Sequence, residues 1–204
     1  MKIVKQISLI LMLLNISAAS AQTDSSPNSK KHFSGRKLTI EPGIGINPAP
    51  MSDLLISNVI QWNFFKRLSI VSHTSYTYNN AFLRDFNYIK TNYDYSLSQK
   101  FGIGASFYTK RSTHTFSLLA GIRKDAFKET LENPEFEKLS VSGSSDSPDI
   151  GFLYNVKVGK KKYFFSYRMY IPLYPYPFMT SDTWSIDRNL ANVSLEFGLG
   201  IRLK

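Results

Sequence analysis

Apolar and polar residues alternate with a period of two along most of the chain. The clearest example is residues 191–203, where every second residue from Ala191 to Leu203 is apolar and the residues between them are polar or glycine. Successive side chains of a β-strand point to opposite faces, so this segment predicts a strand with one apolar and one polar face.

The same alternation recurs in eight further segments, which makes nine predicted strands. They are residues 38–46, 54–62, 68–78, 89–97, 101–107, 115–123, 151–158 and 163–171. Strands of about ten residues have the length that a tilted barrel strand needs to cross a bilayer. Tight connections are predicted at 65–67, 98–100, 110–112 and 159–161. Longer loops are predicted at 47–53, 79–85, 127–149 and 174–189.

The number of strands is left between eight and ten. A barrel with both termini on one side of a membrane needs an even number, which nine strands do not provide. A tenth strand at Lys138–Ser144 would make the number even. So would a count of eight, if 54–62 or another weak segment is not a membrane-spanning strand. The predicted fold is therefore an all-β, closed antiparallel transmembrane β-barrel of eight to ten strands.

Alternation alone leaves open which face points outward. A soluble, lipocalin-like periplasmic carrier would turn its apolar face into a central cavity. The polar faces here are mostly Gly, Ser, Thr and Asn, whereas a soluble surface is rich in charged residues. Aromatic residues also lie near the predicted strand ends, as in the aromatic belts of membrane proteins. These are Trp62, Tyr76, Tyr78, Tyr93, Tyr163, Tyr174 and Tyr176. We therefore expect the apolar face to point outward.

The N-terminus predicts export. Lys2 and Lys5 precede an apolar stretch at 7–16, and small residues follow at 19–21. This is the layout of a secretory signal peptide, with cleavage expected after Ala21. Residues 22–36, rich in Ser, Asn and Lys, are predicted to be a flexible leader, and residues 37–204 the barrel. No later stretch reaches the 18 apolar residues of a transmembrane helix.

Composition narrows the function classes. The 204 residues include no cysteine, which excludes a disulfide framework, a thiolate zinc site and a cysteine nucleophile. The formal net charge is +10, but an exported protein rarely meets nucleic acid, and we expect none as a partner. The positive residues are scattered or lie in turns, where they contact solvent or anionic lipid headgroups.

The signal peptide, the alternating strands and the C-terminal strand LEFGLGIRLK together resemble small outer-membrane β-barrel proteins of Gram-negative bacteria. The chain ends in Lys204 rather than in the terminal aromatic residue that is commonest there. The resemblance implies outer-membrane localisation, with outer-membrane lipid, lipopolysaccharide and the barrel-insertion machinery as partners. It fixes neither activity nor oligomeric state, because the class includes pores, adhesins, structural proteins and lipid-modifying enzymes.

His73 and Ser75 are the candidate catalytic pair. At this spacing they share a strand face, and a serine hydrolase needs an imidazole beside its hydroxyl. The segment looks like the His-x-Ser arrangement of outer-membrane phospholipases and lipid A deacylases, although Tyr76 stands where the deacylases have Asn. Glu41, Asp94 and Glu196 are possible orienting acids. A plain polar position inside the barrel is the alternative, and a non-enzymatic structural, narrow-pore or surface-contact role is the main hypothesis.

Charged residues of both signs fall on the polar faces. We expect them to fill the barrel with ion pairs and hydrogen bonds, the alternative being a selectivity ring in a porin-like pore. These residues are Glu41, Lys90, Asp94, Arg123, Lys157, Arg168, Glu196 and Arg202.

The remaining motifs suggest contacts more than chemistry. The proline- and tyrosine-rich segment 170–178 predicts a rigid loop base or a contact surface, and the acidic segment 128–138 a short extracellular helix. His32, His73 and His114 are far apart, and the acidic residues match no calcium-loop spacing. We expect neither a metal nor a cofactor.

Overall fold

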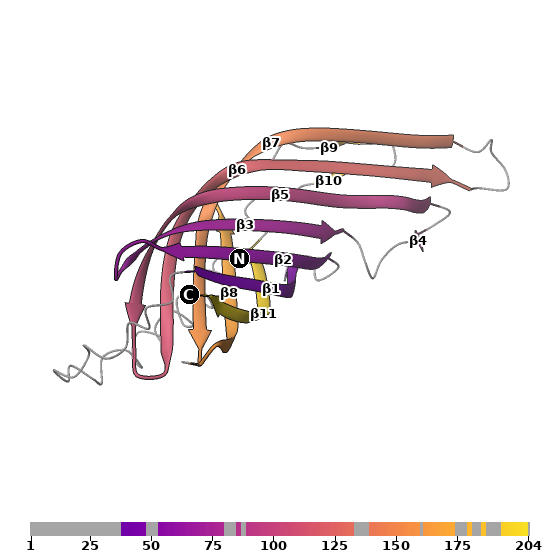
Figure 1. The fold of residues 1–204 in the computed structure, drawn as a ribbon. Coiled ribbons are helices and arrows are strands. Elements are labelled where there is room, and N and C mark those ends of the chain that lie inside the picture. Colours follow the sequence, from indigo (N-terminus) through magenta and orange to yellow (C-terminus); the bar gives the residue numbers. More distant parts are fainter. Residues whose placement is uncertain are drawn as a thin grey trace, which may run out of the picture.

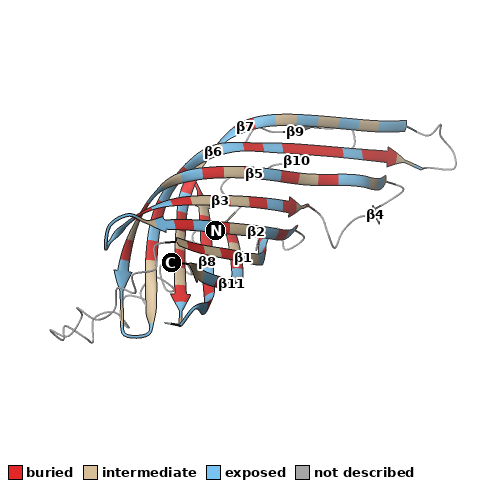
Figure 2. Cartoon of the chain, in the orientation of Figure 1, coloured by how far each residue is buried: buried red, intermediate tan, exposed pale blue. Residues whose placement is uncertain are grey.

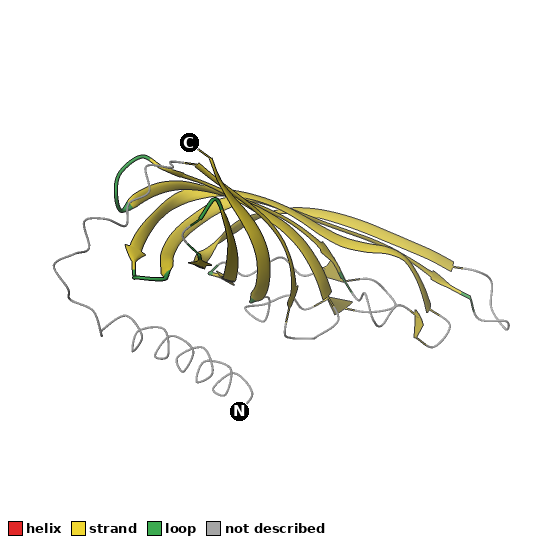
Figure 3. Cartoon of the chain, turned by 60° about the horizontal axis from the view of Figure 1, so that its bottom comes forward, coloured by secondary structure: helices red, strands yellow, loops and turns green. Residues whose placement is uncertain are grey.

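The computed structural model describes residues 38–47, 53–79, 85–86, 89–132, 139–159, 161–173, 179–180, 185–186 and 193–203. The predicted signal peptide and leader lie outside these residues. Within them the chain forms strands and connecting loops, with no helix (Figure 3). No helix that is long and apolar enough to cross a membrane is found in this part of the chain.

Eleven strands are present in the described residues, and eight of them are long. The long strands are β1 (Leu38–Asn47), β2 (Asp53–Asn63), β3 (Leu68–Tyr78), β5 (Ile89–Tyr108), β6 (Ser112–Leu131), β7 (Leu139–Val158), β8 (Tyr163–Pro172) and β11 (Ser194–Leu203). The short ones are β4 (Asp85–Phe86), β9 (Met179–Thr180) and β10 (Ser185–Ile186).

The eight long strands form an antiparallel ring. Each pairs with the next along the chain, β3 pairs with β5, and β11 returns to pair with both β8 and β1. The sequence prediction of an all-β antiparallel barrel is therefore confirmed in its class and strand direction, with eight strands in the ring. β2 is a full member, so the weak segment at 54–62 is not the reason for the lower count.

The connections at the two ends of the ring differ in length. β2–β3, β5–β6 and β7–β8 are joined within a few residues, at 64–67, 109–111 and 159–162, and β1 begins and β11 ends beside these turns. We call this side the turn end. The connections at 48–52, 79–88, 132–138 and 173–193 lie at the other side, the loop end.

Ser98, Gln99 and Lys100 lie inside β5, so the tight connection predicted there is wrong. The phase of the alternation explains why. Leu97, Gln99 and Phe101 all lie on one face, with Ser98 and Lys100 buried on the other. A polar tripeptide that keeps the phase continues a strand, and two predicted strands are therefore one strand of 20 residues.

The long loop predicted at 127–149 is also wrong over most of its length. The β6–β7 ladder continues outward from Arg123↔Ser147 to Leu131↔Leu139. The predicted tenth strand at 138–144 belongs to β7 from Leu139 onward, and Lys128–Leu131 are strand rather than helix; residues 133–138 lie outside the described residues. β5, β6 and β7 therefore extend beyond their neighbours at the loop end (Figure 1).

Burial alternates along the ring strands, as Figure 2 shows by its change between red and pale blue. The buried face is mostly polar, and large apolar side chains such as Ile44, Ile103 and Leu199 are more than 60% exposed on the other face. The apolar face therefore points outward, as predicted from the sequence. Among the described residues, Val59, Val71, Leu119, Leu153 and Tyr170 form one buried apolar cluster in the interior.

Candidate functional site

The interior of the ring holds the titratable side chains that the alternation turns inward. Four groups of ion pairs and hydrogen bonds occupy it among the described residues, one after another from the turn end toward the loop end. The first three join side chains from strands that are not neighbours and so reach across the interior, whereas the fourth stays along the adjacent strands β3, β5 and β6.

The first group centres on Glu41 and Lys157. The Lys157 Nζ lies 2.5 Å from Glu41 Oε1 and donates hydrogen bonds to Thr39 Oγ1 and Gln61 Oε1 at 2.9 and 2.8 Å. Asn155 Nδ2 donates to the second Glu41 oxygen at 2.8 Å. Since β7, which carries Lys157, lies opposite β2, which carries Gln61, in the ring order, this lysine crosses the interior.

The second group centres on Glu196. Its carboxylate lies 3.1 Å from His73 Nε2 and 3.2 Å from Arg168 Nε, and it accepts a hydrogen bond of 2.6 Å from Ser57 Oγ. Arg168 also donates to the backbone oxygen of Glu41 at 2.7 Å, which links the first two groups. The guanidinium occupies the space beside Gly43, where a Cβ would lie 1.9 Å from Arg168 Nη2.

The third group joins Lys100 to Asp149. The Lys100 Nζ lies 2.8 Å from Asp149 Oδ2, which also accepts a hydrogen bond of 2.6 Å from Ser98 Oγ. Tyr170 donates its hydroxyl to the other Asp149 oxygen, and its ring centroid lies 4.0 Å from Lys100 Nζ. Both charges are buried, and every polar neighbour named here is bonded to one of them.

The fourth group lies nearest the loop end. Arg123 Nε lies 3.0 Å from both carboxylate oxygens of Asp125, and Arg123 Nη2 donates to Ser96 Oγ at 2.7 Å. Asn79 Nδ2 donates to Asp94 Oδ1 at 2.6 Å and to Ser96 Oγ at 3.2 Å. This group ties β3, β5 and β6 together below the extension.

The structure brings Glu41, Asp94, Arg123, Lys157, Arg168 and Glu196 into this interior network. Two other residues of the predicted set lie elsewhere. Lys90 is exposed near the start of β5, level with the second residue from the end of β6. Arg202 is half-buried at the turn end, where it donates to the backbone oxygens of Gly159 and Lys161.

Sequence reasoning missed Lys100, Asp125 and Asp149. The sequence predicts a turn at Lys100 and a loop at Asp149, and neither prediction places these residues on a strand face. The alternation alone could have found Lys100, because it continues in phase from Ser96 through Ser98. Several partners are not visible in the sequence, because they come from strands two or three places away in the ring, as for Lys157 with Glu41 and for His73 with Glu196. Arg123 and Asp125, in contrast, are two residues apart on β6.

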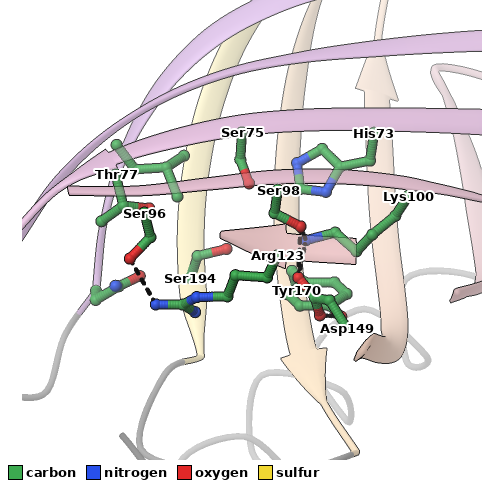
Figure 4. Close-up of a pocket in the computed structure, with 12 residues that line it drawn as sticks. His73, Ser75, Thr77, Ser96, Ser98, Lys100, Arg123, Asp149, Tyr170 and Ser194 are labelled. Carbon is green, nitrogen blue, oxygen red and sulfur yellow. Dashed lines mark hydrogen bonds and ion pairs between the residues drawn. The ribbon is translucent and has the colours of Figure 1, made fainter. Parts of the chain in front are cut away.

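A small cavity lies within the interior, beside the second and third groups. Twelve residues line it, and Figure 4 shows His73 and Ser75 directed from β3 toward the side where Ser98 and Lys100 lie. About 20 Å³ of it is open to water, which is room for about one or two water molecules. His73 and Ser75 are 1% and 6% exposed, so this pair faces the interior rather than the outer, apolar face.

The geometry gives His73 an acidic neighbour but little access for a substrate. Glu196 stands where an orienting acid is needed, yet Arg168 and Ser57 bind the same carboxylate. Acyl-chain hydrolysis requires the substrate carbonyl within reach of the serine hydroxyl. A cavity with room for one or two water molecules does not admit an acyl chain.

No group of three or more His, Cys, Asp and Glu side chains that could hold a metal ion is present within the described ranges. The segment 170–178 is described only as far as Leu173: Tyr170 points inward, and Ile171 and Pro172 end β8.

No protein-family model matches the chain, and no curated protein is similar to it in sequence. Among solved structures, the N-terminal β-barrel domain of Pseudomonas aeruginosa OprF is similar, with a TM-score of 0.44 and 11% sequence identity. The match covers 82% of this chain and 98% of that domain. A likeness this distant says nothing about activity.

Proposed function

We propose that this chain is a non-enzymatic outer-membrane β-barrel whose interior is closed by buried ion pairs. Its role is structural, in the cell envelope, with surface contact through the extension of β5, β6 and β7. One observation carries the proposal: a ring of antiparallel strands exposes most of its large apolar side chains and buries most of its charged ones.

The outward face supports a lipid environment. The apolar side chains of all eight ring strands stand exposed, among them Ile44, Phe101, Leu118 and Phe165. Each exposed Å² of apolar surface costs about 25 cal/mol in water, so a continuous apolar wall favours hydrocarbon as its surroundings. The ring also pairs the backbone groups of its strands, as hydrocarbon requires. The soluble-carrier alternative needs the opposite orientation, with the apolar side chains around a central cavity, so the exposed apolar wall favours the membrane barrel over it.

The ends of the ring fit the two interfaces of a membrane. Trp62 and Tyr163 are 47% and 66% exposed beside the turn end, where aromatic rings of interfacial belts lie. The turns themselves carry exposed cations, which suit phospholipid phosphates. They are Lys66, Arg67, Lys110, Arg111, Lys161 and Lys162. We expect lipopolysaccharide at the loop end and the barrel-insertion machinery as a transient partner during biogenesis.

The interior supports a closed barrel rather than a pore. Lys157 bridges opposite walls, and each of the four groups places opposite charges in contact. A conducting pore needs a continuous water-filled path, which these side chains occupy. In a planar bilayer we expect the purified protein to give no steady channels, and regular discrete conductance steps would overturn this part of the proposal.

Gel mobility tests the architecture directly. Membrane barrels resist detergent until heated, so unboiled protein should migrate differently from boiled protein and should stay with the membrane after a carbonate wash. Release with the osmotic-shock fluid, or equal mobility of the two samples, would contradict the proposal.

A lipid-directed hydrolase is the second candidate, favoured only by the contact of His73 with Glu196. The variant Ser75→Ala tests it. We expect the acyl chains of lipid A and phospholipid to be the same in envelopes that overproduce the wild type, the variant or neither. Deacylated lipid that appears with the wild type and disappears with the variant would establish the enzyme.

A further inference from the structure

The apolar outer wall of the described ring is interrupted by uncharged polar residues at mid-strand. Its other outward positions carry Leu, Ile, Val, Met, Ala, Pro or aromatic side chains, apart from Ser112 and His114 at the turn end and from Lys124 and Asp146, which pair with each other where β6 and β7 approach the extension. Four residues with amide or aliphatic hydroxyl groups interrupt the wall at mid-strand. These four are Asn58, Ser72, Thr74 and Gln99, on β2, β3 and β5, and we call them the polar patch.

The polar patch lies at mid-strand. Asn58 is the central residue of β2, it pairs with Thr74 on β3, and Thr74 pairs with Gln99 on β5. The row therefore crosses three neighbouring strands at the level that a bilayer would make most apolar. Thr74 Oγ1 donates to Gln99 Oε1 at 2.5 Å, and Gln99 Nε2 donates to Ser72 Oγ at 3.0 Å.

One hydrogen-bond acceptor of the polar patch has no donor within the patch. The side-chain oxygen of Asn58 is buried and accepts no hydrogen bond. In hydrocarbon, where no water is available, an unpaired amide oxygen is strongly destabilising. Polar side chains inside a membrane usually mark a function, and lipid tails offer these groups no partner.

We propose that the polar patch is the interface through which two copies of this chain associate within the membrane, an inference that rests on the proposed membrane location. The two walls would meet face to face around a two-fold axis near Thr74. The axis would bring the Asn58 amide of one copy to the patch of the other.

Two properties of the patch favour a second copy as the occupant. Its amides and hydroxyls are both donors and acceptors, so the same patch is complementary to itself under a two-fold rotation, as an isologous interface requires. Its side chains are also half-buried between the more exposed Ile56, Ile70 and Phe101. Small polar residues let two membrane surfaces approach closely, and hydrogen bonds across such contacts add stability.

Disulfide trapping tests the proposal, because the chain contains no cysteine of its own. The variant Thr74→Cys places a thiol at the centre of the patch. Tyr167→Cys is the matched control, since Tyr167 is exposed at mid-strand on β8, on the opposite wall of the ring. Membranes containing each variant would be treated with copper phenanthroline and run on a non-reducing gel without boiling.

We expect a band of twice the mass for Thr74→Cys, about tenfold stronger than for the control, which corresponds to about 1.4 kcal/mol of preferred contact. Equal dimer yields from both variants would overturn the proposal. So would a trapped band from Thr74→Cys at another mass, which would identify a different membrane protein as the occupant. If no dimer is trapped but the monomer bands of both variants show the mobility of a folded barrel, only the dimer proposal fails. If the monomer of neither variant shows that mobility, the membrane-barrel proposal fails as well.

A second variant tests the hydrogen bonds themselves. Asn58→Leu with Gln99→Leu, made in the Thr74→Cys background, turns the patch apolar without adding a charge or a large ring. We expect the trapped dimer to fall to the level of the Tyr167→Cys control while the folded monomer remains. A dimer yield unchanged by these substitutions would contradict the proposed interface.

Discussion

Lys157 shows how a single residue depends on the two-faced strand that carries it. The alternation turns it inward, where its ammonium group meets Glu41 and Thr39 from β1 and Gln61 from β2. A buried ion pair is weak evidence of stability, but removal of one partner leaves an uncompensated charge.

The variant Lys157→Met should therefore lower the free energy of unfolding by about 3–5 kcal/mol, because Glu41 would remain buried without its cation. Urea titration of protein refolded into phosphatidylcholine vesicles measures the effect. The exposed residue Lys124 supplies the control Lys124→Met, which should change little. If the two variants unfold at the same urea concentration, the pair does not hold the interior together.

The double variant Glu41→Leu with Lys157→Met makes a separate prediction. It removes both charges, so most of the lost stability should return. A double variant less stable than Lys157→Met alone would mean that Glu41 matters through Asn155 and Thr39 rather than through the lysine.

At the residue scale the sequence predicts the face of a side chain better than its partner. Glu41, Arg168 and Glu196 are identified as inward from the alternation alone. Their contacts depend on which strands face each other across the ring. The sequence pattern of a single strand does not show which strands lie opposite it. His73 and Ser75 are an example. Their spacing on one strand face can be read from the sequence, but the small size of the cavity around them cannot.

At the scale of the strand, β5 and β6 depend on glycines where they lie very close. A Cβ at Gly121 would lie 1.9 Å from the backbone oxygen of Gln99, and one at Gly102 would lie 1.8 Å from that of Leu118. Both obstacles are backbone atoms, which cannot rotate away. The two strands approach here more closely than larger residues would allow.

Gly121→Ala should lower the free energy of unfolding by about 1–3 kcal/mol, the usual cost of forcing extra atoms into packed surroundings. Its neighbour Ala120 points outward and is exposed, so Ala120→Val adds bulk at the same level and should be tolerated. Urea unfolding in vesicles compares the two. Equal stability of Gly121→Ala and wild type would show that the strands can separate without cost.

The predicted strands are correct in type, and the errors concern where they end. Ser98–Lys100 looked like a turn because it is polar, although its phase agrees with the residues on both sides. The sequence does not predict the outer parts of β6 and β7, because neither face there is consistently apolar. Where a hairpin extends beyond the ring, the apolar pattern that marks a lipid-facing strand is no longer required.

At the scale of the whole molecule, the ring has two unlike ends. The turn end carries short basic turns, and the loop end carries the longer connections and the extension. Outer-membrane barrels have short periplasmic turns and longer extracellular loops, so the proposed membrane location predicts that the turn end faces the periplasm. The sequence does not predict the count of eight strands. The predicted strands 89–97 and 101–107 form the single strand β5, and the predicted tenth strand at 138–144 is part of β7 from Leu139 onward.

Labelling of intact cells tests the orientation. Ser144→Cys lies in the outer part of β7 and Arg111→Cys in a turn, and both positions are exposed. A membrane-impermeant maleimide should label Ser144→Cys in whole cells, but Arg111→Cys only after the cells are broken. The reverse pattern would mean that the barrel is inserted the other way round.

The central claim is that the apolar face of each strand touches hydrocarbon while the polar face lines a closed interior. A nitroxide placed at each position of β11 in turn, in vesicles, tests it most directly. We expect collisions with dissolved oxygen to peak at Leu195, Phe197, Leu199 and Ile201 and to fall at Ser194, Glu196 and Gly198 between them. Equal oxygen access at all positions, or contact of the apolar positions with a water-soluble nickel complex, would contradict the account.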